Sequence, residues 1–263
     1  MQSKKSDDSM FALLGREEPA AFERRLGTPG SPFVIIGDHA SRRIPASLGT
    51  LGLADSDVER HIGWDIGIAG VIDQLAVELD AFAIRQNWSR LVIDCNRPLD
   101  SPTSIPERSD VTLIPGNVDL SPQARRQRQE EIFWPYHHAI SAELDRRAIT
   151  REPTLLVSMH SFTPLLKGEQ RPWHLGVLYN RGVDVAQQAL SILRESGEWV
   201  VGDNQPYAIT DSSDYAVPVH AEPRGLPHVE LEIRQDLLAT LEHQREWAVR
   251  VAVWLRELAT RVL

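Results

Sequence analysis

Short apolar runs of strand length alternate with segments of helical periodicity, and this alternation restricts the possible folds more than any other feature. Residues 33–36 and 154–159 are apolar runs that favour buried strands. Residues 67–79 carry apolar side chains at helical spacing. Strands that alternate with helices are typical of a layered α/β fold with a largely parallel sheet.

The same reasoning predicts the remaining elements. Further strands are expected at residues 81–84, 91–93, 173–179 and 229–233, and further helices at residues 121–151, 183–195 and 236–263. Residues 98–120 and 202–226 are predicted loops, and the first is long enough to be functional or disordered. The polar residues 1–30 are predicted to form a partly ordered arm before a single α/β domain at residues 31–263.

Charge and composition exclude several classes of protein. The formal net charge of −9 argues against binding along a nucleic-acid backbone, which requires a basic face. Cys95 is the only cysteine, so the chain cannot form an intramolecular disulfide, as is usual in a reducing cytoplasm. No apolar stretch approaches the roughly 18 to 20 residues that span a bilayer. We therefore expect a cytoplasmic protein without nucleic-acid or membrane partners; the sequence leaves its oligomeric state open.

Three predicted strands end in polar clusters. Asp38 and His39 follow the first, residues 94–97 follow the strand predicted at 91–93, and His160 and Ser161 end the strand predicted at 154–159. In open α/β sheets ligands bind beyond the carboxyl ends of the strands. Parallel pairing would therefore bring the three clusters together into one site.

His39 and His160 are candidate metal ligands. Two histidines and one carboxylate can hold zinc and leave a fourth position for water. Asp65, close to the start of the helix predicted at residues 67–79, is the expected third ligand. The spacing of the three residues is long and irregular, so each histidine could alternatively form a structural hydrogen bond with a neighbouring loop.

Two further patterns suggest substrate binding and acid–base chemistry. The guanidinium of Arg97, next to Asn96, suits a substrate carboxylate, but Arg97 could instead form an ion pair with Asp94 or Asp100. Glu230 and Glu232 lie two apart on a predicted strand and share a face, so either could act as a general base.

Other catalytic schemes have little support. No serine lies in the Gly-x-Ser-x-Gly pattern, and neither the phosphate-loop pattern nor Gly-x-Gly-x-x-Gly occurs. Cys95 is expected to be a buried, inert thiol.

Several of these segments together resemble the N-formylglutamate amidohydrolase family. The most specific of them is Asp94-x-Asn96-Arg97, which follows a Ser-Arg pair. The matching segments keep the order of the family from about residue 33 to residue 240: residues 38–45, 64–67, 89–98, 128–137, 159–161 and 230–234.

The resemblance implies a fold and an activity. The fold would be a three-layer α/β/α sandwich similar to that of zinc carboxypeptidases, with a mostly parallel mixed sheet of the phosphorylase/hydrolase-like kind. Residues 31–263 would form a hydrolase domain that cleaves N-formyl-L-glutamate to formate and glutamate, a step of histidine degradation, and the partner would be a small acidic N-acyl amino acid.

The resemblance also implies roles for particular residues. His39 and His160 match metal-binding histidines, so the expected cofactor is Zn²⁺, and Glu232 matches the catalytic glutamate. Asn96 and Arg97 match a pair that binds a substrate carboxylate, and Arg108 from the predicted loop 98–120 is expected to help them. Arg128 is more simply a charge on a helix surface.

The sequence also departs from the pattern of the related enzymes. Carboxypeptidases use His-x-x-Glu, whereas Arg42 stands three residues after His39, so the third ligand is inferred to be Asp65. The first motif is Asp-His-Ala-Ser rather than Pro-His-x-Gly. Two alternatives therefore remain: a hydrolase of another N-acyl amino acid, or a metal-free module that binds an acidic metabolite.

Overall fold

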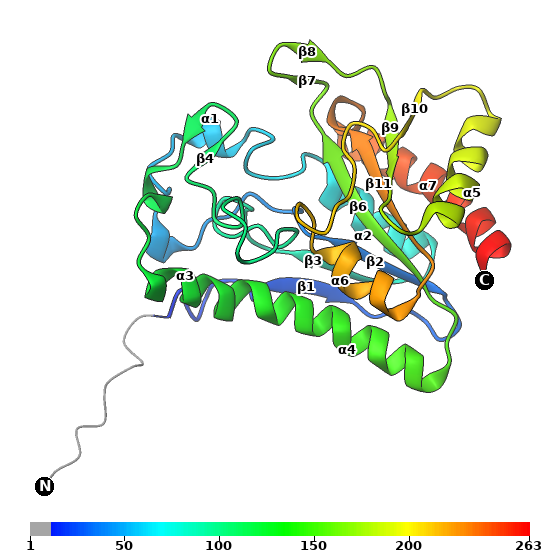
Figure 1. Cartoon of the computed structure of the whole chain (residues 1–263), viewed down its shortest axis with the longest axis horizontal. Helices are drawn as coiled ribbons and strands as arrows, with labels where there is room; N and C mark the ends of the chain where they lie inside the picture. The colour runs from blue at the N-terminus through cyan, green and yellow to red at the C-terminus, as the bar shows by residue number, and fades with distance from the viewer. Residues whose placement is uncertain (1–11) are drawn as a thin grey trace, which may run out of the picture.

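Within residues 12–263, which the computed structural model describes, seven strands form one mixed sheet with helices on both faces (Figure 1). These strands are β1 (Phe22–Arg25), β2 (Phe33–Gly37), β3 (Phe82–Gln86), β6 (Leu155–Phe162), β9 (Leu175–Leu178), β10 (Val201–Asp203) and β11 (His228–Arg234). Their order across the sheet is β1-β3-β2-β6-β11-β9-β10.

Most neighbouring strands of this sheet are parallel. β3, β2, β6 and β11 run in the same direction, and β10 is parallel to β9. β1 is antiparallel to β3, and β9 is antiparallel to β11. The predicted α/β fold with a mostly parallel mixed sheet is therefore confirmed.

Helices and short hairpins connect the strands. The helices are α1 (Asp55–Val58), α2 (Ile68–Glu78), α3 (Pro122–Arg128), the π-helical segment η3 (Gln129–Phe133), α4 (Trp134–Thr150), α5 (Val183–Glu195), α6 (Ala216–His220) and α7 (Leu241–Val262). The 3-10 turns are η1 (Ala46–Leu48), η2 (Pro115–Asn117), η4 (Glu222–Arg224) and η5 (Gln235–Leu238). Two hairpins pair β4 (Arg108–Ser109) with β5 (Thr112–Leu113) and β7 (Leu165–Leu166) with β8 (Glu169–Gln170).

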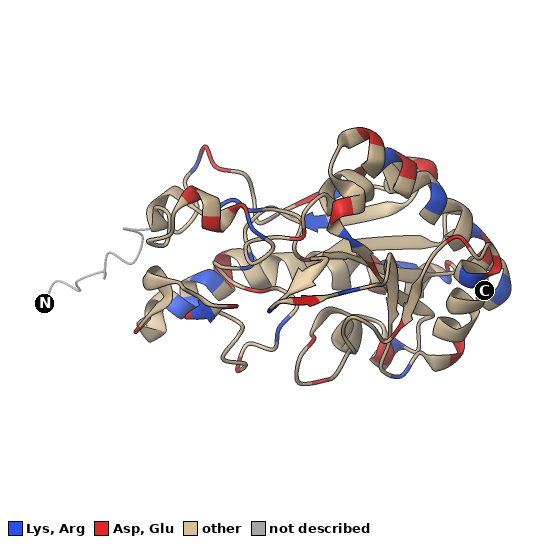
Figure 2. Cartoon of the chain, turned by 90° about the horizontal axis from the view of Figure 1, so that it is seen from above, with Lys and Arg blue, Asp and Glu red and all other residues tan. Residues whose placement is uncertain are grey.

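The strands bury side chains on both faces, and this produces the three layers. Phe33 and Ile35 of β2 join a core with α2, α5 and α7, whereas Val34 and Ile36 join a second core with α4 and α6. The alternation follows from the two-residue period of a strand. Figure 1 shows α4 along one side of the sheet and α2, α5 and α7 on the other. Figure 2 shows acidic and basic residues interspersed along the covering helices.

The apolar run Leu91-Val92-Ile93 was predicted to be a strand, and that prediction was wrong. These residues are buried in the second core but lie in a turn. Their carbonyl oxygens are satisfied by side chains: Asn117 Nδ2 donates to Leu91 O (2.8 Å) and Arg128 Nη1 donates to Val92 O (2.8 Å). Side-chain donors thus supply hydrogen bonds that a neighbouring strand would otherwise supply. The apolar pattern of residues 91–93 does not reveal these distant donors.

Arg128 is buried rather than a charge on a helix surface. Besides the Val92 carbonyl, it donates to Asn117 Oδ1 (2.7 Å), and burial lowers its pKa to about 10. The guanidinium therefore connects helix α3 to the turns that precede the site.

The predicted arm also differs in part. Residues 22–25 form β1, whose register pairs Phe22 with Gln86, so this part of the arm joins the sheet. Residues 1–11 of the arm lie outside the described residues. Among residues 12–263, no helix is long and apolar enough to cross a membrane.

Candidate active site

The site lies where three neighbouring parallel strands end. His39 follows β2, His160 lies in the last part of β6, and Glu232 is the register partner of His160 on β11. Odd-numbered residues of β6 and β11, such as Met159 and Leu231, face the core that contains α2, α5 and α7. His160 and Glu232 therefore point to the opposite face of the sheet, where they lie side by side.

Asp65 reaches the same place from the turn before α2. Its backbone N–H donates to the carbonyl oxygen of His39 (2.9 Å), which fixes the turn against the end of β2. Its Oδ2 accepts a hydrogen bond from the backbone N–H of Ser161 (3.3 Å). The carboxylate is thus held between two strand ends.

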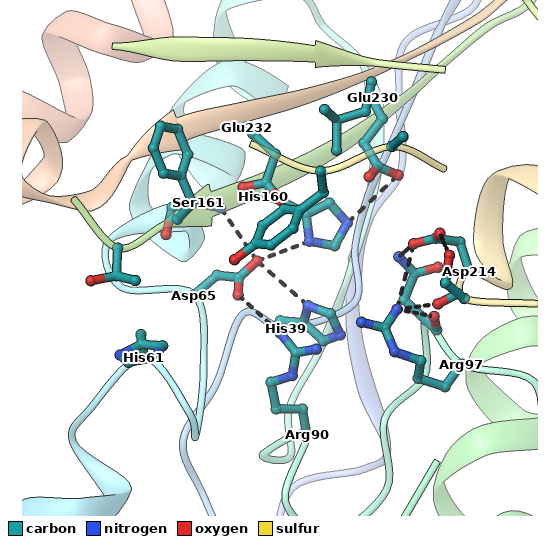
Figure 3. A pocket seen from close by; sticks show the side chains of 17 residues that line it. His39, His61, Asp65, Arg90, Arg97, His160, Ser161, Asp214, Glu230 and Glu232 are labelled. Atoms are coloured by element: carbon teal, nitrogen blue, oxygen red, sulfur yellow. Dashed lines mark hydrogen bonds and ion pairs between the residues drawn. The ribbon is translucent and has the colours of Figure 1, made fainter. Parts of the chain in front are cut away.

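These side chains line a cavity of about 310 Å³ (Figure 3). Six residues predicted for the site lie on its wall: His39, Asp65, Asn96, Arg97, His160 and Glu232. Arg108, which was also predicted to bind substrate, does not line it. Arg108 is exposed in the β4–β5 hairpin, and its Nη1 donates to the carbonyl oxygen of Val111 (3.0 Å).

His39 and His160 direct the same ring nitrogen toward Asp65. Nδ1 of His160 lies 2.9 Å from Asp65 Oδ2, and Nδ1 of His39 lies 3.5 Å from the same oxygen. One ligand atom from each residue lies within 4.8 Å of the others, and all three residues are buried. His39 Nδ1 has no hydrogen-bond partner in the structure.

The outward-facing ring nitrogens are held by acceptors. His39 Nε2 donates to Asp94 Oδ1 (2.7 Å), so its Nδ1 carries a free lone pair. His160 Nε2 lies 3.1 Å from Ser158 Oγ and 3.6 Å from Asp38 Oδ2. A metal-binding histidine typically donates its second N–H to a carboxylate in this way, which orients the ring. The orphaned Nδ1 and these outer partners fit a divalent metal bound by His39, Asp65 and His160.

Asp94 joins this arrangement to Arg90. Arg90 Nη2 lies 2.7 Å from Asp94 Oδ2, and Arg90 Nη1 lies 3.6 Å from Asp65 Oδ1. Burial alone would raise the pKa of Asp94, but the charge of Arg90 and the hydrogen bond from His39 outweigh burial and hold it well below its usual range. Asp94 therefore remains an anion that can orient His39.

Two glutamates on β11 are buried beside His160. Glu230 Oε2 and Glu232 Oε2 have no hydrogen-bond partner, and Glu230 Oε2 lies 4.0 Å from His160 Nε2. Burial raises the pKa of Glu230 to about 7 and that of Glu232 to about 8, although the charge of His160 opposes both shifts. Glu232 is thus a carboxyl group whose free oxygen faces the candidate metal ligands.

Arg97 also lines the cavity, and the segment before α6 holds its guanidinium. Its Nη1 donates to the carbonyl oxygens of Asn96 (3.0 Å) and Ser213 and lies 3.5 Å from Asp214 Oδ1. Asn96 Oδ1 accepts from the backbone N–H groups of Tyr215 (3.0 Å) and Ala216 (2.9 Å). The acid partner of Arg97 is therefore Asp214, not Asp94 or Asp100.

A buried histidine pair supports the turn that carries Asn96. His137 Nε2 donates to the carbonyl oxygen of Cys95 (2.9 Å), so His137 Nδ1 accepts from His220 Nε2 (2.9 Å). Burial lowers the pKa of His137 to about 4 and that of His220 to about 3. Both rings are neutral and act as a structural support, and Cys95 is buried as expected.

A model of the N-formylglutamate amidohydrolase family matches residues 31–239, a segment that contains all the residues of the site described above. The chain belongs to the N-formylglutamate amidohydrolase family. It is therefore a hydrolase that acts on amide bonds.

Solved structures show the same fold. Gene product Atu2144 from Agrobacterium tumefaciens is 31% identical, with a TM-score of 0.91 over 95% of this chain and 99% of that chain. The N-formylglutamate amidohydrolase from Ralstonia eutropha JMP134 is 19% identical, with a TM-score of 0.67 over 91% of this chain and 99% of that chain. No curated protein sequence matches the chain significantly.

Sequence reasoning missed the roles of several site residues in this member of the family. Arg90 and Asp94 lie in the segment that carries the resemblance, so a role for them could have been sought there. Asp214 and Tyr207 belong to the predicted loop 202–226, where no local pattern marks them. Asp214 contacts Arg97, and the hydroxyl of Tyr207 accepts a hydrogen bond from Arg171; both partners are distant in sequence.

Replacing Asp94 should weaken metal binding. We expect Asp94→Asn to lower zinc affinity by about 10- to 100-fold, the usual contribution of a group that orients a metal-binding histidine. Competition with a chromophoric chelator measures the affinity, and thermal unfolding checks the fold. Asp100→Asn removes the same charge from an exposed neighbouring position and should leave affinity unchanged. Equal affinity in the two variants would show that Asp94 does not act on His39.

Proposed function

We propose that the chain is a zinc-dependent hydrolase that cleaves N-formyl-L-glutamate to formate and L-glutamate. One observation carries this proposal. The inward Nδ1 atoms of His39 and His160 meet the carboxylate of Asp65 in the cavity that also holds Glu232 and Arg97. A metal-ligand set, a free carboxyl group and a cation for substrate are the parts that hydrolysis of an anionic amide requires.

His39, Asp65 and His160 would hold the zinc ion. Two imidazoles and one carboxylate are a common zinc donor set, and they leave a position open. When bound, zinc supplies a Lewis acid that polarises an amide carbonyl and lowers the pKa of water. Asp94 orients His39 and Ser158 orients His160, with the carboxylate of Asp38 3.6 Å from His160 Nε2.

Glu232 is the proposed general base. Its side chain lies beside His160, is buried, and has an oxygen with no partner. A divalent cation bound at His39, Asp65 and His160 would favour the ionised form of Glu232, and the carboxylate can then take a proton from water and return it to the departing amine. Glu230 lies two residues earlier on the same face, so the two glutamates must be separated by experiment.

Arg97 is the proposed contact for one substrate carboxylate. Asp214 and two backbone carbonyls use only its Nη1, so Nε and Nη2 have no partner among the described residues. The loop before α6 therefore orients the guanidinium without consuming its remaining donors. Asn96 acts here as a positioning residue, because its side chain binds the backbone of that loop.

A second candidate function is hydrolysis of another N-acyl amino acid. The departure of residues 38–41 from the pattern of the family motivates it. Relative rates for formyl, acetyl and succinyl glutamate and aspartate distinguish the two. Membership in an amidohydrolase family weighs against a metal-free binding module. A place in histidine degradation and a cytoplasmic location are part of the same proposal.

Metal removal tests the proposal. Protein purified without chelator should contain close to one zinc per chain by mass spectrometry and should release formate from N-formyl-L-glutamate. Treatment with a chelator should abolish formate release, because it removes zinc from the side chains of His39, Asp65 and His160. Added zinc should restore formate release, because these ligands remain in the protein. Formate release that survives complete metal removal would contradict the zinc-dependent mechanism.

The two glutamates are separated by amide substitutions. Glu232→Gln should lower kcat by at least about 100-fold, the usual contribution of a general base, while zinc content stays at the wild-type level. Glu230→Gln is the matched variant and should retain far more activity. If Glu230→Gln is the inactive variant and Glu232→Gln is active, the assignment of the base is reversed.

A further inference from the structure

We infer that Arg171 binds the second carboxylate of the substrate at the rim of the cavity and so determines the preference for an acidic amino acid. The inference rests on the proposed function, since N-formylglutamate carries two carboxylates. A carboxylate that enters a partly buried site without a cationic or hydrogen-bonding partner is costly. The substrate therefore requires a second contact besides Arg97.

The two arginines that line the cavity already have acidic partners. Arg90 contacts Asp94 and lies near Asp65, whereas Arg97 lies beside Asp214. Neighbouring carboxylates thus compensate most of the positive charge of these two guanidinium groups. One of these arginines can bind one substrate carboxylate through its remaining N–H donors. The two arginines together supply no uncompensated positive charge for the second carboxylate.

Arg171 differs because no carboxylate of the described residues lies within the 4.0 Å of an ion pair. It follows the β7–β8 hairpin and is half-buried. Its Nη1 donates to the Tyr207 hydroxyl (2.8 Å), and its Nε and Nη2 have no partner within residues 12–263. A guanidinium with free donors and no acidic partner can bind an anion through two N–H groups, so Arg171 is a candidate anion site.

Two aromatic rings of the cavity wall hold Arg171 in place. The guanidinium carbon lies 4.6 Å from the centre of the Tyr207 ring and 5.8 Å from that of Phe162. Both rings line the cavity, whereas Arg171 is not itself a lining residue and is held next to this part of the wall. Stacking on aromatic faces orders a guanidinium before a ligand arrives, and this lowers the entropic cost of binding.

The charge of Arg171 also acts inside the cavity. His61 lines the cavity wall, and burial is the main cause of its lowered pKa. Arg171 is among the cations that lower the pKa of His61 further. The field of this guanidinium thus reaches His61 on the cavity wall.

Two substrates that are matched in shape but differ in charge test this role. N-formyl-L-glutamate and N-formyl-L-glutamine have nearly the same shape and differ by one negative charge. In Arg171→Gln, kcat/KM for the glutamate substrate should fall by about 10- to 100-fold, mainly through KM, as expected for a lost charge-assisted hydrogen bond. The value for the glutamine substrate should change by less than about 3-fold.

Lys167→Gln is the matched control. Lys167 is exposed in the turn of the same β7–β8 hairpin, so this variant removes the same charge without touching Phe162 or Tyr207. Its preference for the glutamate substrate should equal that of the wild type. If Arg171→Gln lost both substrates equally, Arg171 would act only by supporting Tyr207, and the inference would fail.

Calorimetric binding of L-glutamate and L-glutamine to the zinc-loaded protein gives a readout that needs no turnover. The wild type should prefer L-glutamate, and Arg171→Gln should lose that preference. If the wild type releases no formate but shows this Arg171-dependent preference, the proposed reaction is wrong and the carboxylate site stands. If Arg171→Gln binds L-glutamate as tightly as the wild type does, the inference is overturned.

Discussion

The parallel pairing of β2 with β6 and of β6 with β11 is the constraint on which the rest of the site depends. Parallel strands end at the same edge of a sheet, so residues distant in sequence meet there. This pairing puts His39, His160 and Glu232 within one cavity. The turn before α2 then adds Asp65 through a backbone hydrogen bond to His39. A shift of one residue in either register would move these side chains to the opposite face.

The chain concentrates negative charge at this edge. Among the described residues, five carboxyl groups around the candidate metal ligands are at most 6% exposed: Asp38, Asp65, Asp94, Glu230 and Glu232. Arg90 is their near cationic partner, and the rings of His39 and His160 lie within 4.0 Å of several of them. Burial of charge is unfavourable unless partners compensate it, so this excess fits a site built to bind a cation. Burial and the neighbouring carboxylates raise the pKa of Glu230 and Glu232, whereas closer contacts with the histidines and Arg90 lower the pKa of Asp65 and Asp94.

Sequence patterns predicted the fold and the convergence of the strand ends, because apolar periodicity records which faces are buried. They failed at residues 91–93, where side chains supply hydrogen bonds that a neighbouring strand would otherwise supply. There Asn117 and Arg128 donate to the carbonyl groups of Leu91 and Val92. They also missed β1, which has only one strand neighbour and exposes most of its side chains. Asp214 lies in the site only through long-range hydrogen bonds of a loop, and one local segment carries no sign of them.

The most direct test of the account is anomalous diffraction at the zinc absorption edge from crystals of the zinc-loaded protein. We expect one strong peak bonded to Nδ1 of His39, Nδ1 of His160 and a carboxylate oxygen of Asp65, at about 2.0 to 2.2 Å from each. Glu232 should lie beside that peak without being its ligand. A peak elsewhere, or none at this position after soaking in zinc, would contradict the assignment of these residues as a metal site.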